Sequence, residues 1–401
     1  MDKPTGPTER PCDACGAAAL VAFSEVGDLP IETGRHFASE ARAMASPVGR
    51  VVLGRCPRCA YVRNLAFEAT LVDPAAPTDM NLYHSPTFRR FCSGLIVDLV
   101  DRLPVRGARV LEVGCAQGEF LKELCAVAGC TGIGYDASYA GPEGPDPSGA
   151  ELRAGPAPLD GNLPPYDVLV SRFALEHVDD PLSFLSSLRR QAGDRPVVAH
   201  VQVPDAGYDL ATAGWEVIYP HVSYFNVSAL CAIAERAGWR VTGTGAVFSG
   251  LIRYVELSSA PGAARETDDL GTPLDLGLDA ARDAQLAALR GFDARHHRMR
   301  RHWAETISRL ADEGAKPVLW GAGSRGVQLL TFADPKRRLT AVVDVNPAKW
   351  GRFLPVTGHR VDPPDSLPRD VRAVVITNPV YRAEIARSLR DLGITAEILA
   401  A

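Results

Sequence analysis

The chain has 401 residues, 46% of them hydrophobic and 23% charged, and its formal net charge is -5. This length exceeds one ordinary hydrophobic core, so we expect two or three domains, and the acidic balance argues against nucleic acid as a partner. The chain shows no apolar run of about twenty residues and no signal or transit peptide, so we expect a cytoplasmic protein with reduced cysteines and no membrane partner.

Two C-x-x-C pairs occur near the N-terminus, Cys12 with Cys15 and Cys56 with Cys59. Four thiolates in two tight pairs suit the tetrahedral geometry of zinc, and a site closed by four sulfurs leaves no position for chemistry. Two redox disulfides or four unrelated thiols are the alternatives. We predict a structural zinc ion that staples residues 1–75, a segment expected to be too small and polar to form its own core.

A break rich in proline and alanine begins at Asp73, and large apolar residues then recur at helical spacing from Phe88 to Leu99. A helix directly before the first strand of an α/β domain would lie over its ligand site. Tyr83, at the entry to this helix, is therefore a candidate for contact with substrate or cofactor. The alternative is a helix cap with an exposed tyrosine.

Residues 109–124 predict a strand, a glycine turn and a helix in succession. Gly114 and Gly118 allow a ligand to approach the backbone where a Cβ atom would collide, and the helix offers free N–H groups at its N-terminus. The next predicted strand, residues 132–136, ends at Asp136, and a carboxylate there can accept both hydroxyls of a ribose. The turn lacks the middle glycine of the dinucleotide pattern, and a turn without any ligand is the alternative.

This turn, together with the acid Glu112 inside the preceding strand, resembles motif I of class I S-adenosylmethionine (SAM) methyltransferases. The resemblance implies that Glu112 and the turn face the methionine end of SAM and that Asp136 holds its ribose. A strand predicted over 166–171 is followed by a segment similar to the one after the fourth strand in that family. By this resemblance the cofactor site comprises Glu112, Gly114, Cys115, Gln117, Gly118, Asp136, Arg172 and Phe173.

His177 lies in the segment after that strand, and the resemblance puts it near the transferring methyl, although a helix-capping or core histidine is the alternative. A further strand is predicted over 196–203. Residues 215–226 then form a loop dense in aromatic and polar side chains, which is typical of a binding pocket. A helix starting at Asn226 and two closing strands, 239–242 and 251–257, complete a domain that we place at residues 76–260.

Residues 261–313 are predicted to form a polar linker, 261–275, followed by one long connecting helix. Apolar or large side chains recur at helical spacing from Leu286 to Leu310. The basic cluster between Arg295 and Arg301 could touch a phosphate, although such a cluster is more often a solvated face.

The last unit, residues 314–401, again predicts a strand, a glycine turn and a helix. Its sequence Gly321-Ala-Gly-Ser-Arg-Gly326, followed by a strand ending at Asp344, satisfies the dinucleotide fingerprint. An NAD-dependent oxidoreductase is therefore a competing function. Against it, the unit is short and is expected to lack the second mononucleotide-binding half.

The order of these parts resembles the sugar C-methyltransferases: a four-cysteine segment, a SAM core, an aromatic loop with His-x-Ser-Tyr-Phe, and a final unit with Asp-Val-Asn-Pro. The resemblance implies an α/β protein with a class I Rossmann-like core, an N-terminal zinc segment and a Rossmann-like C-terminal domain. It also implies C-methylation of a nucleotide-activated keto-deoxysugar in an antibiotic pathway. The substrate-binding candidates are Tyr83, Gly321, Gly323, Ser324, Arg325 and Asn378.

C-methylation beside a ketone needs a base that removes a proton, polar groups for the enolate oxygen, and alignment with the methyl donor. His221, on the aromatic loop, is the first choice of base. His177, Tyr224 and Tyr219 are candidates for orienting or protonating the substrate.

The family carries a Glu-His pair in this loop, whereas Pro220 precedes His221 here. Glu216 or Glu176 could supply the missing carboxylate. The departure leaves open a different small-molecule acceptor, methylated at carbon or oxygen. A non-catalytic sugar-nucleotide-binding protein is a further alternative, and either a monomer or a homodimer is compatible with the sequence.

Overall fold

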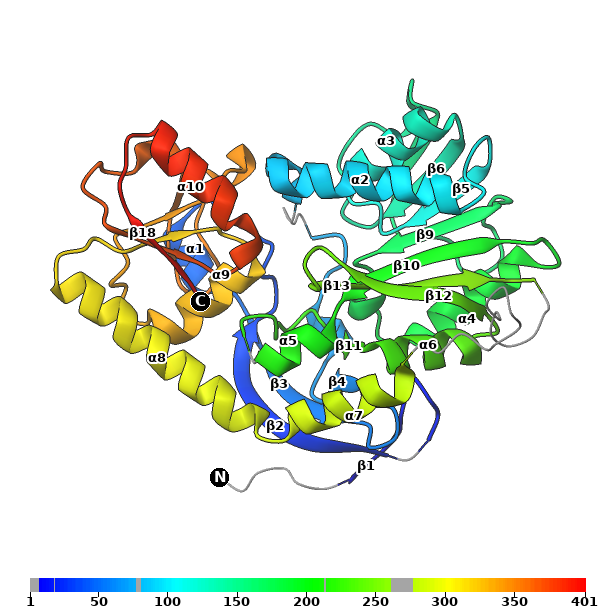
Figure 1. The fold of residues 1–401 in the computed structure, drawn as a ribbon, viewed down its shortest axis with the longest axis horizontal. Helices are drawn as coiled ribbons and strands as arrows, with labels where there is room; N and C mark the ends of the chain where they lie inside the picture. The colour runs from blue at the N-terminus through cyan, green and yellow to red at the C-terminus, as the bar shows by residue number, and fades with distance from the viewer. Residues whose placement is uncertain (1–6, 18, 77–80, 213, 261–276) are drawn as a thin grey trace.

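The computed structural model describes residues 7–17, 19–76, 81–212, 214–260 and 277–401, which contain three sheets (Figure 1). An eight-stranded sheet forms the central domain, a five-stranded antiparallel sheet the N-terminal domain, and a five-stranded parallel sheet the C-terminal domain. The linker predicted at 261–275 falls outside these residues. None of the helices described here is both long and apolar enough to cross a membrane.

The central sheet has the order β12-β13-β10-β9-β5-β6-β8-β7. Strands β5, β6, β8, β9 and β10 run parallel, whereas β13 is antiparallel to both β10 and β12. The sheet grows from β5 first toward β6 and later toward β9, and ligands bind at the carboxyl ends of strands at such a switch point. The strands are β5 (Arg109–Val113), β6 (Thr131–Asp136), β7 (Gly144–Pro145), β8 (Ala150–Ala154), β9 (Val168–Arg172), β10 (Val198–Pro204), β12 (Arg240–Val247) and β13 (Ile252–Ser258).

Side-chain caps begin two helices of this domain at the places that the sequence indicates. The Ser85 hydroxyl accepts the Phe88 N–H at 3.2 Å to start α2, and Asn226 accepts the Ala229 N–H at 2.8 Å to start α6. The helices and short 3-10 turns are η2 (Leu82–His84), α2 (Pro86–Arg102), α3 (Glu119–Ala128), η3 (Leu175–His177), α4 (Pro181–Ala192), α5 (Ala206–Thr212) and α6 (Val227–Arg236).

The N-terminal sheet, of order β1-β2-β3-β4-β11, has an apolar core that it shares with later residues such as Leu210 and Phe292. The expectation that residues 1–75 are too polar to contribute to a core is therefore wrong, although they do not form this core by themselves. Leu29, Ile31, Val51 and Leu53 are at most 1% exposed. The reason is the alternation along β2, which buries every second side chain over most of its length. The elements are β1 (Pro7–Pro11), β2 (Ala19–Pro30), α1 (Glu40–Met44), β3 (Val48–Arg55), β4 (Val62–Asn64), η1 (Ala69–Leu71) and β11 (Ser223–Tyr224).

The C-terminal sheet has the order β16-β15-β14-β17-β18, so strands lie on both sides of β14. Two strands of the second mononucleotide-binding half are therefore present, contrary to expectation. The elements are β14 (Val318–Trp320), α9 (Ser324–Ala333), β15 (Ala341–Val343), η4 (Pro347–Lys349), β16 (Val361–Asp362), η5 (Pro364–Ser366), β17 (Ala373–Ile376), η6 (Pro379–Tyr381), α10 (Arg382–Asp391) and β18 (Glu397–Ala400).

Two helices, α7 (Leu278–Leu289) and α8 (Phe292–Asp312), replace the single long helix predicted from the sequence (Figure 1). The break occurs because Gly291 adopts a left-handed backbone with φ of 80°. The basic cluster at the start of α8 is not simply a solvated face. The Arg300 guanidinium lies 3.4 Å from the centroid of the Phe332 ring, and Arg295 donates to the Leu210 carbonyl at 3.4 Å.

Two helical glycines provide a matched test of this packing. A Cβ atom at Gly326 in α9 would lie 2.2 Å from the Gly321 carbonyl oxygen, whereas one at Gly94 in α2 would meet nothing within 4 Å. We expect Gly94→Ala to stabilise the chain by about 0.5–1 kcal/mol and Gly326→Ala to destabilise it by roughly 1–3 kcal/mol, because only the latter forces backbone apart. Calorimetry should show Tm changes of opposite sign, and changes of the same sign would contradict the packing described.

Candidate functional site

The predicted glycine turn follows β5, and its glycines adopt left-handed backbone, with φ of 84° at Gly114 and 87° at Gly118. A Cβ atom at Gly114 would lie 2.7 Å from the Cβ atom of Ala174, and one at Gly118 would lie 2.3 Å from a methyl group of Leu152. Neighbouring protein therefore requires both glycines, whether or not a ligand does. The contact with Ala174 also joins the turn to η3, which contains His177.

Asp136 ends β6 beside this turn and is surrounded by neutral donors. One carboxylate oxygen accepts the Ala116 N–H at 2.8 Å, and the other accepts the N–H and hydroxyl of Ser138 at 2.8 and 2.7 Å. Gln117 joins the same loops, because its amide donates to the Ser138 carbonyl at 3.2 Å and accepts the Ala140 N–H at 3.3 Å. Since a carboxylate offers about four acceptor positions, capacity remains for a hydroxyl donor of a ligand.

The side chain of Cys115 and the backbone of Phe173, both predicted at the cofactor site, make contacts within the protein. Cys115 is buried, and a Cβ atom at Gly134 would lie 2.9 Å from its sulfur, so its side chain packs beneath the turn. Phe173 follows β9 with an unusual positive φ of 56°, and its N–H donates to the Gln202 carbonyl at 3.0 Å.

A buried polar cluster lies under α2. Glu112 is 1% exposed, and one of its carboxylate oxygens has no hydrogen-bond partner in the described part of the chain. The Arg172 guanidinium lies 3.9 Å from the Phe120 ring centroid and donates to the Gln202 side chain at 3.0 Å. The Tyr83 hydroxyl is likewise buried; among the described residues it makes no hydrogen bond within the usual geometric limits, and it lies close to the Cys92 thiol, within electrostatic reach of Arg172 and Glu112. A spare acceptor beside a spare donor and a guanidinium fits the ammonium and carboxylate of the methionine end of SAM.

His177, in η3, contacts His221, in the loop before β11. Their ring centroids are 4.9 Å apart, and the His221 ring lies 5.9 Å from that of Tyr224. His177 Nδ1 lies 2.9 Å from the Pro220 carbonyl oxygen. Glu176 is 2% exposed, and one of its oxygens finds no partner among the residues described. The structure thus brings together three of the four predicted catalytic residues and Glu176.

Burial controls the protonation of these groups. Desolvation by the surrounding protein lowers the pKa of His177, although part of this side chain is exposed, and it lowers the pKa of His221 well below the usual value, with further lowering from His177 and from the Arg325 guanidinium. Burial also raises the pKa of Glu176 to about 8. Both imidazoles are therefore neutral near pH 7, the form that can accept a proton.

Arg325 brings a positive charge from the C-terminal domain to this place. Its guanidinium lies 3.4 Å from a Glu216 oxygen and 3.8 Å from an Asp209 oxygen. Burial raises the pKa of both carboxyls, and neither Asp209 oxygen has a hydrogen bond in the described residues. The sequence analysis missed Asp209. Its position shortly after the strand ending at Pro204, at the ligand-binding edge of the sheet, is the signal that could have found it.

The structure does not place Tyr219 beside the histidine pair. Its ring packs against Phe67, with centroids 5.4 Å apart, in the core of the N-terminal sheet. Its hydroxyl accepts the Glu68 N–H at 2.9 Å. Tyr224, by contrast, contacts His221, but its hydroxyl is buried and directed at the Ile218 carbonyl at 3.3 Å.

The C-terminal glycine turn differs from the first in its acid. Asp344 accepts the Ala322 N–H at 2.7 Å, the Asn346 N–H at 2.9 Å and the Lys349 ammonium at 3.0 Å. The Lys349 ammonium thus uses an acceptor position that would receive a ribose hydroxyl in a dinucleotide site. Positions Gly321 and Gly323 nevertheless face open space.

The other predicted residues of this turn bond locally. The Ser324 hydroxyl lies 2.9 Å from that of Thr33 in the N-terminal domain. Asn378, at the end of β17, accepts the Val380 N–H at 3.1 Å and so begins η6.

The four predicted zinc ligands come together in the N-terminal domain. The sulfur atoms of Cys12 and Cys59, and those of Cys15 and Cys56, are 3.6 Å apart. This distance is close to the roughly 3.8 Å between sulfurs around a tetrahedral zinc ion, and it is far beyond a disulfide bond of about 2.05 Å. The quartet therefore fits the ion and excludes the disulfide alternative in this structure.

This cysteine quartet is tied to the loop that carries His221. Strand β11 of the loop pairs with β4, which follows the second cysteine pair. The Tyr61 hydroxyl lies 2.6 Å from that of Ser223, and the Asn226 amide donates to the Cys59 carbonyl at 3.3 Å. Arg63 binds Asp13 and Asp179, so the N-terminal domain also holds the segment after η3.

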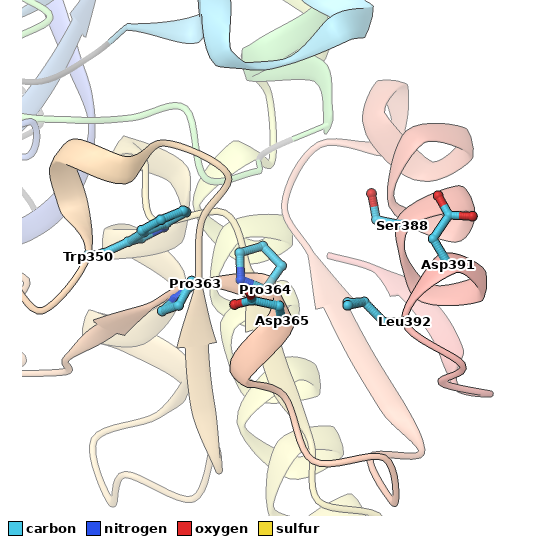
Figure 2. A pocket seen from close by; sticks show the side chains of 7 residues that line it. All are labelled: Trp350, Pro363, Pro364, Asp365, Ser388, Asp391 and Leu392. Atoms are coloured by element: carbon cyan, nitrogen blue, oxygen red, sulfur yellow. The ribbon is translucent and has the colours of Figure 1, made fainter.

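Figure 2 shows a hollow on the C-terminal domain, with the end of α10 on one side and Trp350 and the residues at the start of η5 on the other. It contains none of the predicted site residues, so it is separate from the histidine pair. Its lining consists of Trp350, Pro363, Pro364, Asp365, Ser388, Asp391 and Leu392.

Burial of Glu112 predicts a specific pH dependence of stability. Desolvation raises its pKa from 4.5 to about 7, so folding favours the protonated form and stability falls as the pH rises between these values. Glu112→Gln removes this loss. We expect its stability relative to the parent protein to rise by up to about 3 kcal/mol between pH 4.5 and 7.5, measured by chemical denaturation. The exposed Glu235→Gln is the control, and an equal effect of pH on both variants would contradict the prediction.

Comparisons with known families cover two parts of the chain. Residues 87–243 match the family described as a methyltransferase domain, and residues 277–394 match the family described as a C-methyltransferase C-terminal domain. The second match assigns the C-terminal unit to methyltransferases and not to NAD-dependent oxidoreductases. No curated protein gives a significant match.

Solved structures match the central part of the chain at low identity. A SAM-dependent methyltransferase from Aquifex aeolicus is 16% identical, with coverage of 47% of this chain and 100% of that one and a TM-score of 0.34. One from Mesorhizobium loti is 18% identical, with 40% and 96% coverage and a TM-score of 0.32. Magnesium protoporphyrin IX methyltransferase from Synechocystis PCC 6803 is 15% identical, with 43% and 83% coverage and a TM-score of 0.34.

At these values the structural matches carry no statement about substrate or partner. The family matches, the strand order and the glycine turn do carry a conclusion about class. This chain is a SAM-dependent methyltransferase of the class I fold with a C-methyltransferase C-terminal domain.

Proposed function

We propose that the enzyme transfers a methyl group from SAM to a carbon beside the ketone of a nucleotide-activated deoxysugar, in natural-product biosynthesis. The observation that carries the proposal is the contact between His177 and His221 in the central domain, with the Arg325 guanidinium of the C-terminal domain within electrostatic reach of His221. Such a site can remove a proton from carbon and stabilise the resulting oxyanion.

The chain would hold SAM through the groups around the first glycine turn. Asp136 would hold the ribose hydroxyls, while Glu112 and Arg172 would bind the ammonium and carboxylate of the methionine end. When bound, SAM supplies an electrophilic methyl group on a positively charged sulfur. The segment from Ala174 to His177 leads directly from the turn to the histidine pair, so the acceptor would stand between His221 and the methyl group.

His221 is the proposed base. Its pKa is lowered by burial, so the ring is neutral and can take the proton from the carbon beside the ketone. The Arg325 charge then stabilises the enolate oxygen. Glu176 is the best candidate for the carboxylate missing at Pro220, because an oxygen of its side chain lies within 4.8 Å of a ring nitrogen of His221. Tyr224 would orient the His221 ring through their edge contact, and Tyr219 takes no part in this scheme.

We further propose that the C-terminal turn holds the nucleotide part of the substrate. Gly321 and Gly323 leave open space at the N-terminus of α9, whose N–H groups suit a phosphate. Arg325 is in the first turn of the same helix, so one short segment would contact both the phosphate end and the reacting sugar.

His221→Ala tests the base. We expect turnover to fall by about 10²–10⁴, because the proton is then left without an acceptor, while SAM affinity stays unchanged. Candidate keto-deoxysugar nucleotides in deuterium oxide should exchange the proton beside the ketone with the parent enzyme and not with the variant. Full exchange by His221→Ala would remove this residue as the base.

Asp136→Ala provides the converse result. It should abolish SAM binding, measured by calorimetry, because the ribose loses its carboxylate partner. Circular dichroism is needed in parallel, since the Ala116 and Ser138 bonds are lost as well. A folded variant with unchanged SAM affinity would refute the cofactor site.

We also propose that the cysteine quartet binds one structural zinc ion. Removal of that ion should disorder β4 and, through β11, the loop that carries His221. We therefore expect Cys56→Ser to lose zinc and to lower turnover at least tenfold, while Cys231→Ser, in α6, leaves the zinc content at one per chain. Metal analysis and activity measured together check this, and full activity without zinc would contradict the coupling.

A further inference from the structure

We propose that Glu176, His177 and His221 form a second metal site, which takes a divalent ion of the zinc class and thereby blocks the base. One ligand atom of each residue lies within 4.8 Å of those of the other two. Ligand atoms around a tetrahedral zinc ion are about 3.4 Å apart, so small side-chain rotations suffice to close the site. The inhibitory effect rests on the proposed role of His221, whereas the binding of metal does not.

Each of the three side chains has a ligand atom to spare. His177 Nδ1 lies 2.9 Å from the Pro220 carbonyl, a contact that fixes the proton on Nδ1 and leaves the lone pair on Nε2. Metal-binding histidines commonly donate their other N–H to a backbone carbonyl in this way. Glu176 is 98% buried and has an oxygen without a partner in the described chain. His221 is partly exposed and His177 exposed, so an ion can reach them.

The donor set indicates which ions fit. Two imidazole nitrogens and one carboxylate oxygen suit Zn²⁺ and Co²⁺, whereas Mg²⁺ and Ca²⁺ prefer oxygen ligands. The Arg325 charge opposes a cation nearby, and the carboxyls of Asp209 and Glu216, 3.8 and 3.4 Å from its guanidinium, offset that charge when they are ionised. Three protein ligands also leave a fourth position for water, unlike the closed cysteine quartet.

Metal binding would inhibit catalysis because it uses an electron pair of the His221 ring. A metal ion bound to the ring nitrogen of His221 uses the lone pair that would otherwise accept the substrate proton. The ion would therefore compete with proton removal, and its removal by a chelator would restore the free base. The cysteine quartet, with four sulfurs, should keep its ion under the same mild chelation.

Titration of the full-length protein, already holding one zinc ion per chain, with zinc chloride tests the proposal. We expect a second equivalent to bind, with affinity reduced at least tenfold in His177→Ala and in Glu176→Gln but unchanged in His297→Ala, an exposed histidine on α8. Saturation of the parent protein at one equivalent, or a second equivalent of equal affinity in all variants, would overturn the site. Because His177 is exposed, its variant keeps the test valid if Glu176→Gln fails to fold.

Activity forms an independent second measurement. Zinc at a concentration that fills the second site should reduce turnover at least tenfold, and brief chelation that leaves one zinc per chain should restore it. Binding of the second equivalent without inhibition would overturn the blocking role but not the site. If no acceptor is methylated even by metal-free His177 and His221, the proposed function fails, while the titration still decides whether the site exists.

Discussion

The pairing of β11 with β4 is the contact on which the candidate site depends. Strand β11 is two residues long, yet it attaches the loop with His221 to the domain that carries the cysteine quartet. The Ser223 and Asn226 bonds to Tyr61 and Cys59 strengthen this attachment. A loop held at both of these points loses less conformational entropy when a substrate binds, which favours a base in fixed position.

The same arrangement explains the unusual protonation of the site. The N-terminal domain and the C-terminal glycine turn contact the segments after β9 and β10, and this cover withdraws Glu176 and Asp209 from water and His221 in part. Burial lowers the pKa of His221 and raises the pKa values of the Glu176 and Asp209 carboxyls. Each shift favours the uncharged form of the group. Arg325, by contrast, carries a charge at this site, and the carboxyls of Asp209 and Glu216 beside it stabilise that charge.

Local signals predicted most strands and helices of the two Rossmann-like domains, because glycine turns and caps such as Asn226 act over a few residues. They missed β7 and β8, since the Gly-, Pro- and Asp-rich sequence of residues 141–165 is typical of loops. The core of the N-terminal domain was missed, since its side chains alternate in β2 and meet partners distant in sequence, such as Leu210 and Phe292. The helix break at Gly291 was overlooked because the apolar spacing continues across it. The meeting of Arg325 with Glu216 could not be predicted, because no local pattern relates positions in two separate domains.

The two glycine turns of this chain show that the strand-turn-helix motif alone does not determine which ligand binds. Both have an acid at the end of the next strand, and both acids accept an N–H from the turn, at 2.8 Å for Asp136 and 2.7 Å for Asp344. Only their remaining neighbours differ. Asp136 meets the neutral donors of Ser138, whereas Asp344 binds the buried Lys349 ammonium at 3.0 Å. A carboxylate already neutralised by a buried cation gains little from ribose hydroxyls, so the first turn suits a nucleoside and the second suits a phosphate held by backbone N–H groups.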